Sequence, residues 1–437
     1  MWGFILKQKW TNWGKNQSAV PKGIISPSSE DEIIDLIGRG VANRWKIRPV
    51  GSSHSFSPIC VTDGLIIQLN AFNRILNVDR EQLQITVGAG ITLADLNTEL
   101  ENLGMALPNL GDIDSQTLAG AIATGTHGTG HKYSSISAAV IGLRIATGDG
   151  SILETSISQD PDILKSARVG LGALGIVISV TLQCVKSFNL KGVELTTSLN
   201  DVLERFDAED MRSDFVEFYW YPHTEIAELK INNRTSDPPN NGSRVARFLN
   251  DEVIRNVAFD CLNRYWRYFP QYAPGTFNRT LKIGSTQTRI APSYKIFCSK
   301  RRVKFVEMEY AIPRESLLEA FREVRKITES LDTPVTFPIE VRSLGADDIP
   351  LSPSFGRATG FIAVHVYKTG DHRKYFDQVE NLMREYNGRP HWGKMHNLSY
   401  EDLSLLYPEW EKFMMVRRRL DPDGHFSNAY LERVLGY

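Results

Sequence analysis

Apolar positions in the first third of the chain alternate between helical spacing and strand spacing. In residues 91–104 four leucines fall on one helical face, with Thr92 placed to cap the N-terminus and Gly104 placed to end the helix. Residues 28–40 begin with serines that can cap a helix, continue with acidic residues in the first turn, and have apolar residues at helical spacing, so they predict a helix. Residues 46–51 are typical of a strand that runs into a loop. A hairpin is predicted where two apolar runs flank a Gly-Asp-Gly turn, in residues 140–155.

Beyond about Lys186 the pattern changes to long, aromatic-rich runs. These runs predict strands of a broad sheet at residues 213–222, 301–313, 335–344 and 360–368. Amphipathic helices are predicted between them, at residues 314–331 and 372–387. Residues 232–244, rich in Pro, Asn, Gly and Ser, predict a mobile surface loop. The fold class is therefore α+β, with a second domain after the first third.

Charge and cysteine content limit the classes of partner and the cellular compartment that we expect. Fifty basic and 51 acidic residues leave a formal net charge of -1, which gives no electrostatic footprint for nucleic acid or an anionic membrane. The four cysteines are far apart, so we expect reduced, mostly buried thiols. The N-terminal apolar run stops at Lys7, and no stretch approaches the ~18 apolar residues of a spanning helix. We expect a soluble, cytoplasmic protein with a small or neutral partner.

Two loops are rich in small residues. Residues 48–58 surround His54 with glycine and serines, and residues 117–131 contain four glycines. Such loops let backbone N–H groups converge on a phosphate, although either loop alone is equally explained as a turn. Neither matches the two common nucleotide-binding motifs, G-x-G-x-x-G or G-x-x-x-x-G-K-[ST]. A nucleotide bound here is held in another way.

Charged residues near the C-terminus are further candidates. Glu340 and Arg342 alternate onto one face of a predicted strand, where they form either part of a site or an ordinary charged edge. Lys394 follows a tryptophan and is either a site residue or a surface lysine. A zinc site is the alternative suggested by four histidines, but no H-E-x-x-H motif aligns them and we expect no metal; they are His127, His131, His391 and His396.

Several motifs in order resemble the sugar-1,4-lactone oxidases. The motifs are "GSSHSFSP", "AGAIATGTHGTG", "RVGLGALGIV", "PIEVR", "RPHWGKMHN" and "LDPDGHFSNAYLERVLGY". The resemblance covers nearly the whole chain and points to L-gulono-1,4-lactone oxidase and D-arabinono-1,4-lactone oxidase, relatives of alditol oxidase among the vanillyl-alcohol-oxidase type FAD flavoproteins. It implies a two-domain FAD-binding fold with residues 1–186 as the FAD domain, 187–395 as an α+β cap domain, and 396–437 returning to the FAD domain.

The resemblance also assigns the cofactor. FAD is expected to be joined covalently to the ring of His54, through the 8α-methyl group of the flavin, while the small residues around it cradle the diphosphate. The small residues are Gly51, Ser52, Ser53 and Ser55. Further cofactor contacts implied by the resemblance are Gly111, Ser115, Gly120, Ala123, Thr124, Gly125, His127, Gly128, Gly175, Ile176, Lys394 and Asn428.

The implied reaction oxidises the C2 hydroxyl of an aldono-1,4-lactone by hydride transfer to the flavin. The 2-keto lactone then enolises to ascorbate or an analogue, and dioxygen reoxidises the flavin with release of hydrogen peroxide. Glu340, Arg342 and Lys394 are the implied catalytic residues. Glu340 and Lys394 are rival acceptors of the hydroxyl proton, and a lysine acts as a base only if burial lowers its pKa.

Substrate and electron acceptor depend on a few positions. Gly111 leaves room for dioxygen near the flavin, although a tight turn explains this glycine equally well. Substrate contacts are expected at Asp112, Tyr367 and His391; the first two replace a serine and a threonine of alditol oxidase, which favours a lactone over an acyclic polyol. Charges interrupt residues 251–270, where animal relatives have an apolar stretch, so membrane insertion is not expected.

Other functions stay open at this point. A dehydrogenase with another electron acceptor and an alditol oxidase are the nearest alternatives. An NADPH-dependent reductase of cell-wall precursors uses the same type of FAD domain, a metal-dependent hydrolase would be colourless, and a bare flavin-binding module would have no need of three converging charged residues. The sequence leaves the oligomeric state open.

Overall fold

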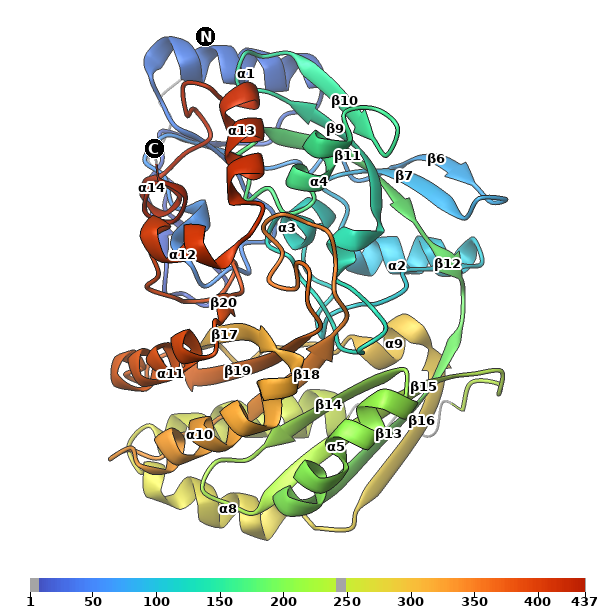
Figure 1. The fold of residues 1–437 in the computed structure, drawn as a ribbon, viewed down its shortest axis with the longest axis vertical. Helices are drawn as coiled ribbons and strands as arrows, with labels where there is room; N and C mark the ends of the chain where they lie inside the picture. The colour runs from blue at the N-terminus through green and yellow to red at the C-terminus, as the bar shows by residue number, and fades with distance from the viewer. Residues whose placement is uncertain (1–7, 241–248, 437) are drawn as a thin grey trace.

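The computed structural model describes residues 8–240 and 249–436. Figure 1 shows two parts, one built from residues 8–186 and the C-terminal helices, the other around a large sheet. The first part opens with the strands β1 (Trp10–Thr11) and β2 (Ser18–Ala19). A parallel three-stranded sheet follows, in the order β3-β5-β4, with bounds Gly23–Ile25, Leu65–Ile67 and Ile47–Pro49.

The helix α1 (Glu30–Asn43) connects β3 to β4, and the Oγ atom of Ser29 accepts a hydrogen bond from the backbone of Glu32. β4 then leads directly into the His54 loop. The second sheet of this part is antiparallel, in the order β10-β9-β11-β7-β6. Its strands are β6 (Ile75–Asp79), β7 (Gln84–Gly88), β9 (Val140–Ala146), β10 (Ile152–Ser156) and β11 (Ile176–Gln183).

Local sequence signals in this part are confirmed. The helix α2 (Leu93–Asn102) begins after Thr92, whose side chain caps it, and Gly104 follows its end with a φ of 74°. β9 and β10 form the predicted hairpin. The remaining elements are α3 (Leu118–Ala123), α4 (Pro161–Ala167), the short pair β8 (Met105–Ala106) and β12 (Val185–Lys186), and the 3₁₀ turns Pro58–Cys60 and Ile136–Ala139.

The second part is an eight-stranded antiparallel sheet in the order β16-β13-β15-β14-β18-β19-β17-β20. Four of its strands confirm the aromatic-rich runs: β14 (Phe215–Trp220), β17 (Phe305–Pro313), β18 (Ile339–Leu344) and β19 (Thr359–Tyr367). The others are β13 (Asn189–Ser198), β15 (Ile226–Thr235), β16 (Thr286–Pro292) and β20 (Arg389–Pro390). The predicted loop at 232–244 is wrong for its first four residues, because β15 continues to Thr235; its residues 241–244 lie outside the described part.

Helices cover one face of this sheet and leave the other face to the first part. Phe218 of β14 packs edge-on against Phe206 of α5 (Leu199–Arg212) and Phe321 of α10 (Leu317–Glu329). Both α10 and α11 (Arg373–Glu385) were predicted from their apolar stripes. Because successive residues of a strand point to opposite faces, the neighbours of Phe218 point away from the helices.

Several shorter elements complete the described chain. They are the π-helical Leu249–Ala258, α7 (Phe259–Trp266), Pro270–Tyr272, α8 (Ala273–Thr280), α9 (Ser293–Phe297), Arg314–Ser316, α12 (Tyr400–Leu406), α13 (Trp410–Leu420) and α14 (Ala429–Leu435). The last three lie beside the N-terminal elements, as the red helices of Figure 1 show.

Arg48 fastens these distant segments together. Its guanidinium, 1% exposed, donates hydrogen bonds to the backbone carbonyls of Ile59, Leu171, Gly172 and Phe426. Burial lowers the pKa of Arg48 to about 10. Four carbonyls from three regions of the chain therefore accept from one buried side chain, and the carbonyl of Ile59 also accepts from Nδ2 of Asn428 at 3.1 Å.

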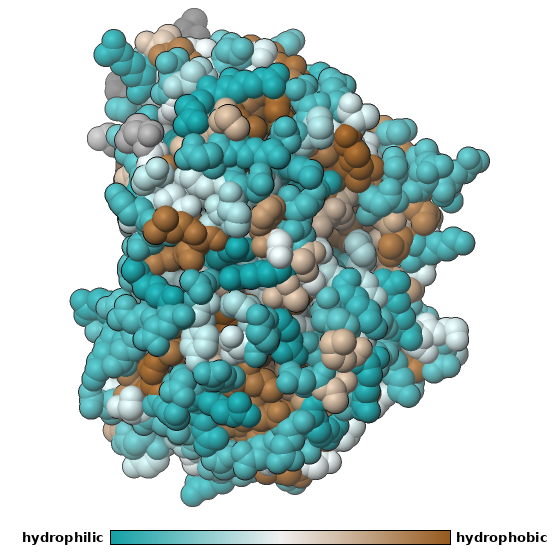
Figure 2. Space-filling model, in the orientation of Figure 1, coloured by the Kyte–Doolittle hydropathy of each residue, from teal (hydrophilic) through white to brown (hydrophobic). Residues whose placement is uncertain are grey.

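On the face shown in Figure 2, hydrophilic residues predominate and the brown apolar patches are separated from one another. No helix within residues 8–240 and 249–436 is long and apolar enough to cross a membrane. All four cysteines are free thiols: Cys184 is buried, Cys60 and Cys298 are half-buried, and Cys261 is exposed, against the expectation of burial.

Candidate active site

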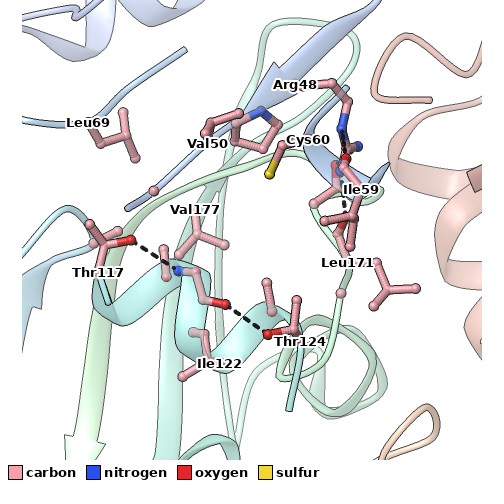
Figure 3. A pocket seen from close by; sticks show the side chains of 18 of the residues that line it. Arg48, Val50, Ile59, Cys60, Leu69, Thr117, Ile122, Thr124, Leu171 and Val177 are labelled. Atoms are coloured by element: carbon pink, nitrogen blue, oxygen red, sulfur yellow. Dashed lines mark hydrogen bonds between the residues drawn. The ribbon is translucent and has the colours of Figure 1, made fainter. Parts of the chain in front are cut away.

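The two loops rich in small residues line one cavity, which we call the glycine-lined cavity. It lies between the His54 loop, residues 116–124 and residues 167–177. Figure 3 shows Arg48 and Ile59 on one side and Thr117, Ile122 and Thr124 on another.

Close backbone approach in this cavity depends on two glycines. A Cβ at Gly51 would lie 2.0 Å from Oγ1 of Thr117, so a larger residue here would force the side chain that caps α3 to move. Gly175 has a φ of 132°, and a Cβ there would lie 2.4 Å from the carbonyl oxygen of Ala146.

A second cavity adjoins the first and separates the two parts of the molecule; we call it the acid-lined cavity. His54, Ser55, Gln116 and Thr124 line both cavities. Its far wall includes residues of the large sheet, namely the carboxylates Glu307, Glu309 and Glu340 with Arg342 and His365, and also Lys394, which follows β20.

Glu340 and Arg342 are buried side chains of the central strand β18, at 6% and 7% exposure, which excludes the alternative of a solvent-exposed edge. Their register places Glu340 beside Tyr219 and Arg342 beside Glu217 of the neighbouring strand β14. The Arg342 guanidinium pairs with Glu340, with Glu217 (Nε to Oε2, 3.1 Å) and with Asp112 (Nη2 to Oδ2, 2.8 Å). One cation is thus shared by three carboxyl groups.

Tyr219 bridges the same acids through its hydroxyl group. It donates toward Glu340 and toward Oδ2 of Asp112, 3.0 Å away. Burial raises the pKa of Glu340 to about 7, since the lowering by Arg342 is opposed by Asp112 and Glu217. Burial alone would also raise the pKa of Asp112, but Arg342 and Arg301 hold it well below its ordinary value. Glu340 is therefore the carboxyl group here that titrates near neutral pH.

Lys394 occupies the opposite side of the cavity, paired with acids of β17. Its Nζ atom forms an ion pair with Glu307 and lies 4.0 Å from Oε2 of Glu309. Burial would raise the pKa of Glu307, but Lys394 and then His365 lower it to about 2. The lysine thus faces carboxylates that stay ionised.

Two of the four histidines considered for zinc come together. His127 and His391 gather with Glu309, with ligand atoms within 4.8 Å of one another. His127 Nε2 already pairs with Glu309 at 3.4 Å, and His391 Nδ1 accepts the backbone N–H of Gly393. Burial lowers the pKa of His391 to about 3. His396 bonds to the hydroxyl of Tyr430 instead, outside this group.

His54 has well-defined contacts at the junction of the two cavities. Its Nε2 atom lies 3.0 Å from Oγ of Ser115, and its ring stacks on Trp13 with centroids 5.1 Å apart. Burial, followed by the nearby cations Lys304 and Lys394, lowers the pKa of His54 to about 4. The imidazole is therefore neutral and available as a nucleophile at physiological pH.

Most residues expected at the site line one of the two cavities. These are Gly51, Ser52, Ser53, His54, Ser55, Gly111, Asp112, Gly120, Ala123, Thr124, His127, Gly175, Glu340, Arg342, His391 and Lys394. Six others line neither: Ser115, Gly125, Gly128, Ile176, Tyr367 and Asn428.

Two of these six have other evident partners. The hydroxyl of Tyr367 donates to Oδ1 of Asp260 at 3.1 Å. Asn428 caps α14 and donates to the carbonyl of Val61 at 2.8 Å. The functional roles of all these positions stay predictions.

Sequence reasoning missed several residues of the acid-lined cavity and Glu217, which contacts Arg342 behind them. Tyr219 and Glu217 alternate in "FVEFYW", and Glu307 and Glu309 alternate in "FVEMEY", in the same manner as Glu340 and Arg342. This repeated alternation could have indicated that these side chains share a face with Glu340 and Arg342. His365, whose Nε2 lies 3.5 Å from Oε1 of Glu307, carried no comparable signal.

The fold is that of the vanillyl-alcohol-oxidase type flavoproteins. The solved cholesterol oxidase from B. sterolicum superimposes with a TM-score of 0.84 over 98% of this chain and 97% of that one, at 18% identity. Residues 21–156 match the FAD binding domain family, and residues 180–434 match the D-arabinono-1,4-lactone oxidase family.

Relatives along the whole chain agree with these matches. The L-gulono-1,4-lactone dehydrogenase of Mycobacterium tuberculosis is 39% identical over 98% of this chain and 99% of its own length. The L-gulonolactone oxidase of Bos taurus is 35% identical over 98% of each chain. The D-arabinono-1,4-lactone oxidase of Saccharomyces cerevisiae is 26% identical over 95% of this chain and 94% of its own. This chain belongs to the D-arabinono-1,4-lactone oxidase family.

The cavities fit the FAD that this family match implies. Two adjoining cavities, one lined by backbone and small residues and one by ionisable groups, suit a dinucleotide whose reactive ring meets the second. Gln116 lines both, and its buried Oε1 atom has no hydrogen-bond partner among the described residues, although its Nε2 donates to Thr126. An unpaired buried acceptor at this junction fits a ligand that donates a hydrogen bond.

Proposed function

We propose that this chain oxidises the C2 hydroxyl of an aldono-1,4-lactone, of the L-gulono-1,4-lactone type, to a 2-keto lactone that enolises to ascorbate or an analogue. The observation that carries the proposal is the convergence of Glu340, Arg342 and Lys394 on the cavity that His54 also lines. FAD, when bound, accepts the hydride that leaves carbon. Side chains of this cavity are proposed to bind and orient the substrate and to accept its hydroxyl proton.

Glu340 is the proposed acceptor of the hydroxyl proton. Its pKa of about 7 lets it be ionised in the resting enzyme and protonated after the reaction. Lys394 is the weaker candidate, because it is paired with Glu307 and lies near Glu309. It acts instead as a fixed cation that stabilises negative charge developing beside it.

Arg342 positions the substrate through the part of its guanidinium that the acids do not use. Its Nε and Nη2 atoms contact protein carboxylates, and its ion pairs with Asp112, Glu217 and Glu340 hold the planar group in one orientation. Asp112 and His391, which line the same cavity, are proposed to contact the lactone. The proposal also retains Tyr367, from the family resemblance alone.

The cofactor is proposed to be attached covalently through His54, with the glycine-lined cavity holding the rest of the dinucleotide. The sheets support a division into an FAD domain of residues 1–186, a cap of 187–395 and a returning segment of 396–437, since β13 to β20 all belong to one sheet. Four free thiols suit a reducing compartment such as the cytoplasm.

Dioxygen is the proposed electron acceptor, with hydrogen peroxide as its product. Gly111 supports it: the residue lines the acid-lined cavity, and its φ lies outside the left-handed region, so the backbone does not by itself require glycine. A dehydrogenase using another acceptor is the second candidate, because the 39% identical relative from Mycobacterium tuberculosis is named for that activity.

A screen of flavin reduction tests the proposal. The purified protein is mixed without oxygen with L-gulono-1,4-lactone, D-arabinono-1,4-lactone, an acyclic alditol or NADPH, and the flavin absorbance is followed. Bleaching by a lactone supports the proposal, whereas bleaching by NADPH alone identifies a reductase. Readmitting air then separates an oxidase, which recovers its colour and forms peroxide, from a dehydrogenase, which recovers only with an added acceptor.

A further inference from the structure

Two residues outside its own loop hold the His54 ring. Ser115, 61 residues further along the chain, places Oγ 3.0 Å from Nε2. Trp13 stacks on the ring with planes inclined by 25°, and Nζ of Lys304 lies 3.8 Å from the centroid of the Trp13 ring. A face contact and an edge contact together fix both the tilt and the rotation of the imidazole.

The N-terminal residues also hold the backbone on either side of His54. The backbone N–H of Trp13 donates to the carbonyl of Ser53 at 2.8 Å, and the indole of Trp10 donates to Oγ of Ser53 at 3.1 Å. The amide of Asn12 donates to the carbonyl of Ser55 at 2.9 Å. Ser53 itself has a φ of 60°, a conformation that needs such support in a residue other than glycine.

We propose that Ser115 and Trp13 are positioning residues for the bond between His54 and the flavin, an inference that rests on the proposed function. Among the described residues, the hydrogen bond to Ser115 is the one that the His54 ring makes, and it uses Nε2. A neutral imidazole carries its proton on one nitrogen and a lone pair on the other. With the proton on Nε2 and donated to the Ser115 hydroxyl, the lone pair is on Nδ1.

The joining step balances with dioxygen as oxidant. One C–H bond of the flavin 8-methyl group breaks and an Nδ1–C bond forms, with release of one proton from the methyl group and one from Nε2. The two electrons left on the flavin pass to dioxygen, which takes up two protons and becomes hydrogen peroxide. Once Nε2 has lost its proton it becomes an acceptor, and the Ser115 hydroxyl can then donate to it, so the same contact serves both states.

The rate of covalent attachment tests the proposal directly. Full-length protein produced under riboflavin starvation is given FAD in air, and samples are acid-precipitated over time. Flavin in the pellet measures attachment, while the absorbance of the native protein after desalting measures binding. The variants are Ser115→Ala and Ser115→Thr, with Ser158→Ala as the control because Ser158 is an exposed serine away from both cavities.

We expect Ser115→Ala to bind FAD normally but to attach it about tenfold more slowly, the effect of one hydrogen bond lost from the transition state. Ser115→Thr, which keeps the hydroxyl, should restore most of the rate, and Ser158→Ala should match the wild type. Attachment by Ser115→Ala at the wild-type rate would overturn the role of Ser115.

A second pair of variants keeps the test decisive if Ser115→Ala binds no FAD. Trp13→Phe retains a ring that can stack and Trp13→Ala does not, so the first should attach flavin faster than the second. Equal rates in both would overturn the proposal. Wild-type protein that binds no flavin contradicts the proposed function itself, whereas flavin that binds but is released wholly by acid contradicts covalent attachment and this inference with it.

Discussion

The pH dependence of flavin reduction should follow the ionisation of Glu340. Burial raises the pKa of this carboxyl to about 7. A raised pKa means that Glu340 is protonated at lower pH and ionised at higher pH, and only the ionised form can accept the hydroxyl proton. For a pKa near 7, about 9% is ionised at pH 6 and about 91% at pH 8. The rate of reduction by a saturating lactone should therefore rise about tenfold between these values and level off above them.

Replacing Glu340 by glutamine removes the base and keeps the shape. We expect the reduction rate to fall by about 10² to 10⁴, the usual contribution of general base catalysis, and the rise with pH to disappear. Anaerobic stopped-flow mixing with freshly dissolved lactone measures this rate at each pH, apart from any step that involves oxygen.

Lys394→Met is the decisive comparison, because Lys394 is the rival base. If Glu340 takes the proton, Lys394→Met reduces the rate but keeps a rise centred within about one unit of pH 7. A rise that persists in Glu340→Gln and vanishes in Lys394→Met would refute the assignment and transfer the role to the lysine.

Three further predictions concern other parts of the molecule. Arg342→Lys should lower kcat/KM for a lactone about 100-fold, because a lysine cannot reproduce the planar fork that three acids hold in place, while FAD content in the native spectrum stays unchanged. Gly111→Ala should slow reoxidation by dioxygen by about tenfold and reduction much less, because Gly111 lines the acid-lined cavity and a methyl group there would fill space that dioxygen uses. Its Cβ would also lie 3.0 Å from the carbonyl oxygen of His127, and strain from that contact alone would slow both half-reactions equally, a result that would contradict the prediction. Arg48→Met should lower the free energy of unfolding by about 3 kcal/mol in denaturant titrations, since it removes the donor of the Leu171, Gly172 and Phe426 carbonyls and one of the two donors to the Ile59 carbonyl, whereas the exposed Arg419→Met should change it by less than about 0.5 kcal/mol.

Elements with strong apolar periodicity were predictable from the sequence. The helix α2 and its cap at Thr92, the β9–β10 hairpin and the strand β18 all follow local patterns that match their burial. β13 and β15 were not singled out, because their residues are mixed in polarity and only partly buried, as in "NLKGVELTTS". Such strands are recognisable chiefly through their partners in the sheet.

Only those residues of the candidate site that belong to a recognisable sequence motif could be predicted. Glu340, Arg342, Lys394 and His54 were identified, and they line one cavity. Their partners could not be, because the contact of Arg342 with Glu217 depends on the register between strands more than a hundred residues apart. Register is set by the packing of the whole sheet and not by either strand alone.

The sheet explains why one carboxyl group among several titrates near neutrality. Tyr219, Glu340, Ala363 and Glu309 are paired in register across four neighbouring strands, and paired residues share a face, so Glu340 and Glu309 point to the same side of the sheet with one strand between them. On one side Lys394 has Glu307 as its close partner, and that acid stays ionised. On the other side the guanidinium of Arg342 pairs with three carboxyl groups, those of Asp112, Glu217 and Glu340. Asp112 also has Arg301 within 3.0 Å and Glu217 has Lys230 within 3.3 Å, whereas the only cation paired with Glu340 among the described residues is the shared Arg342. Glu340, the carboxyl with the smallest share of positive charge, also lines the acid-lined cavity, and that unequal sharing makes it suited to exchange a proton with a substrate.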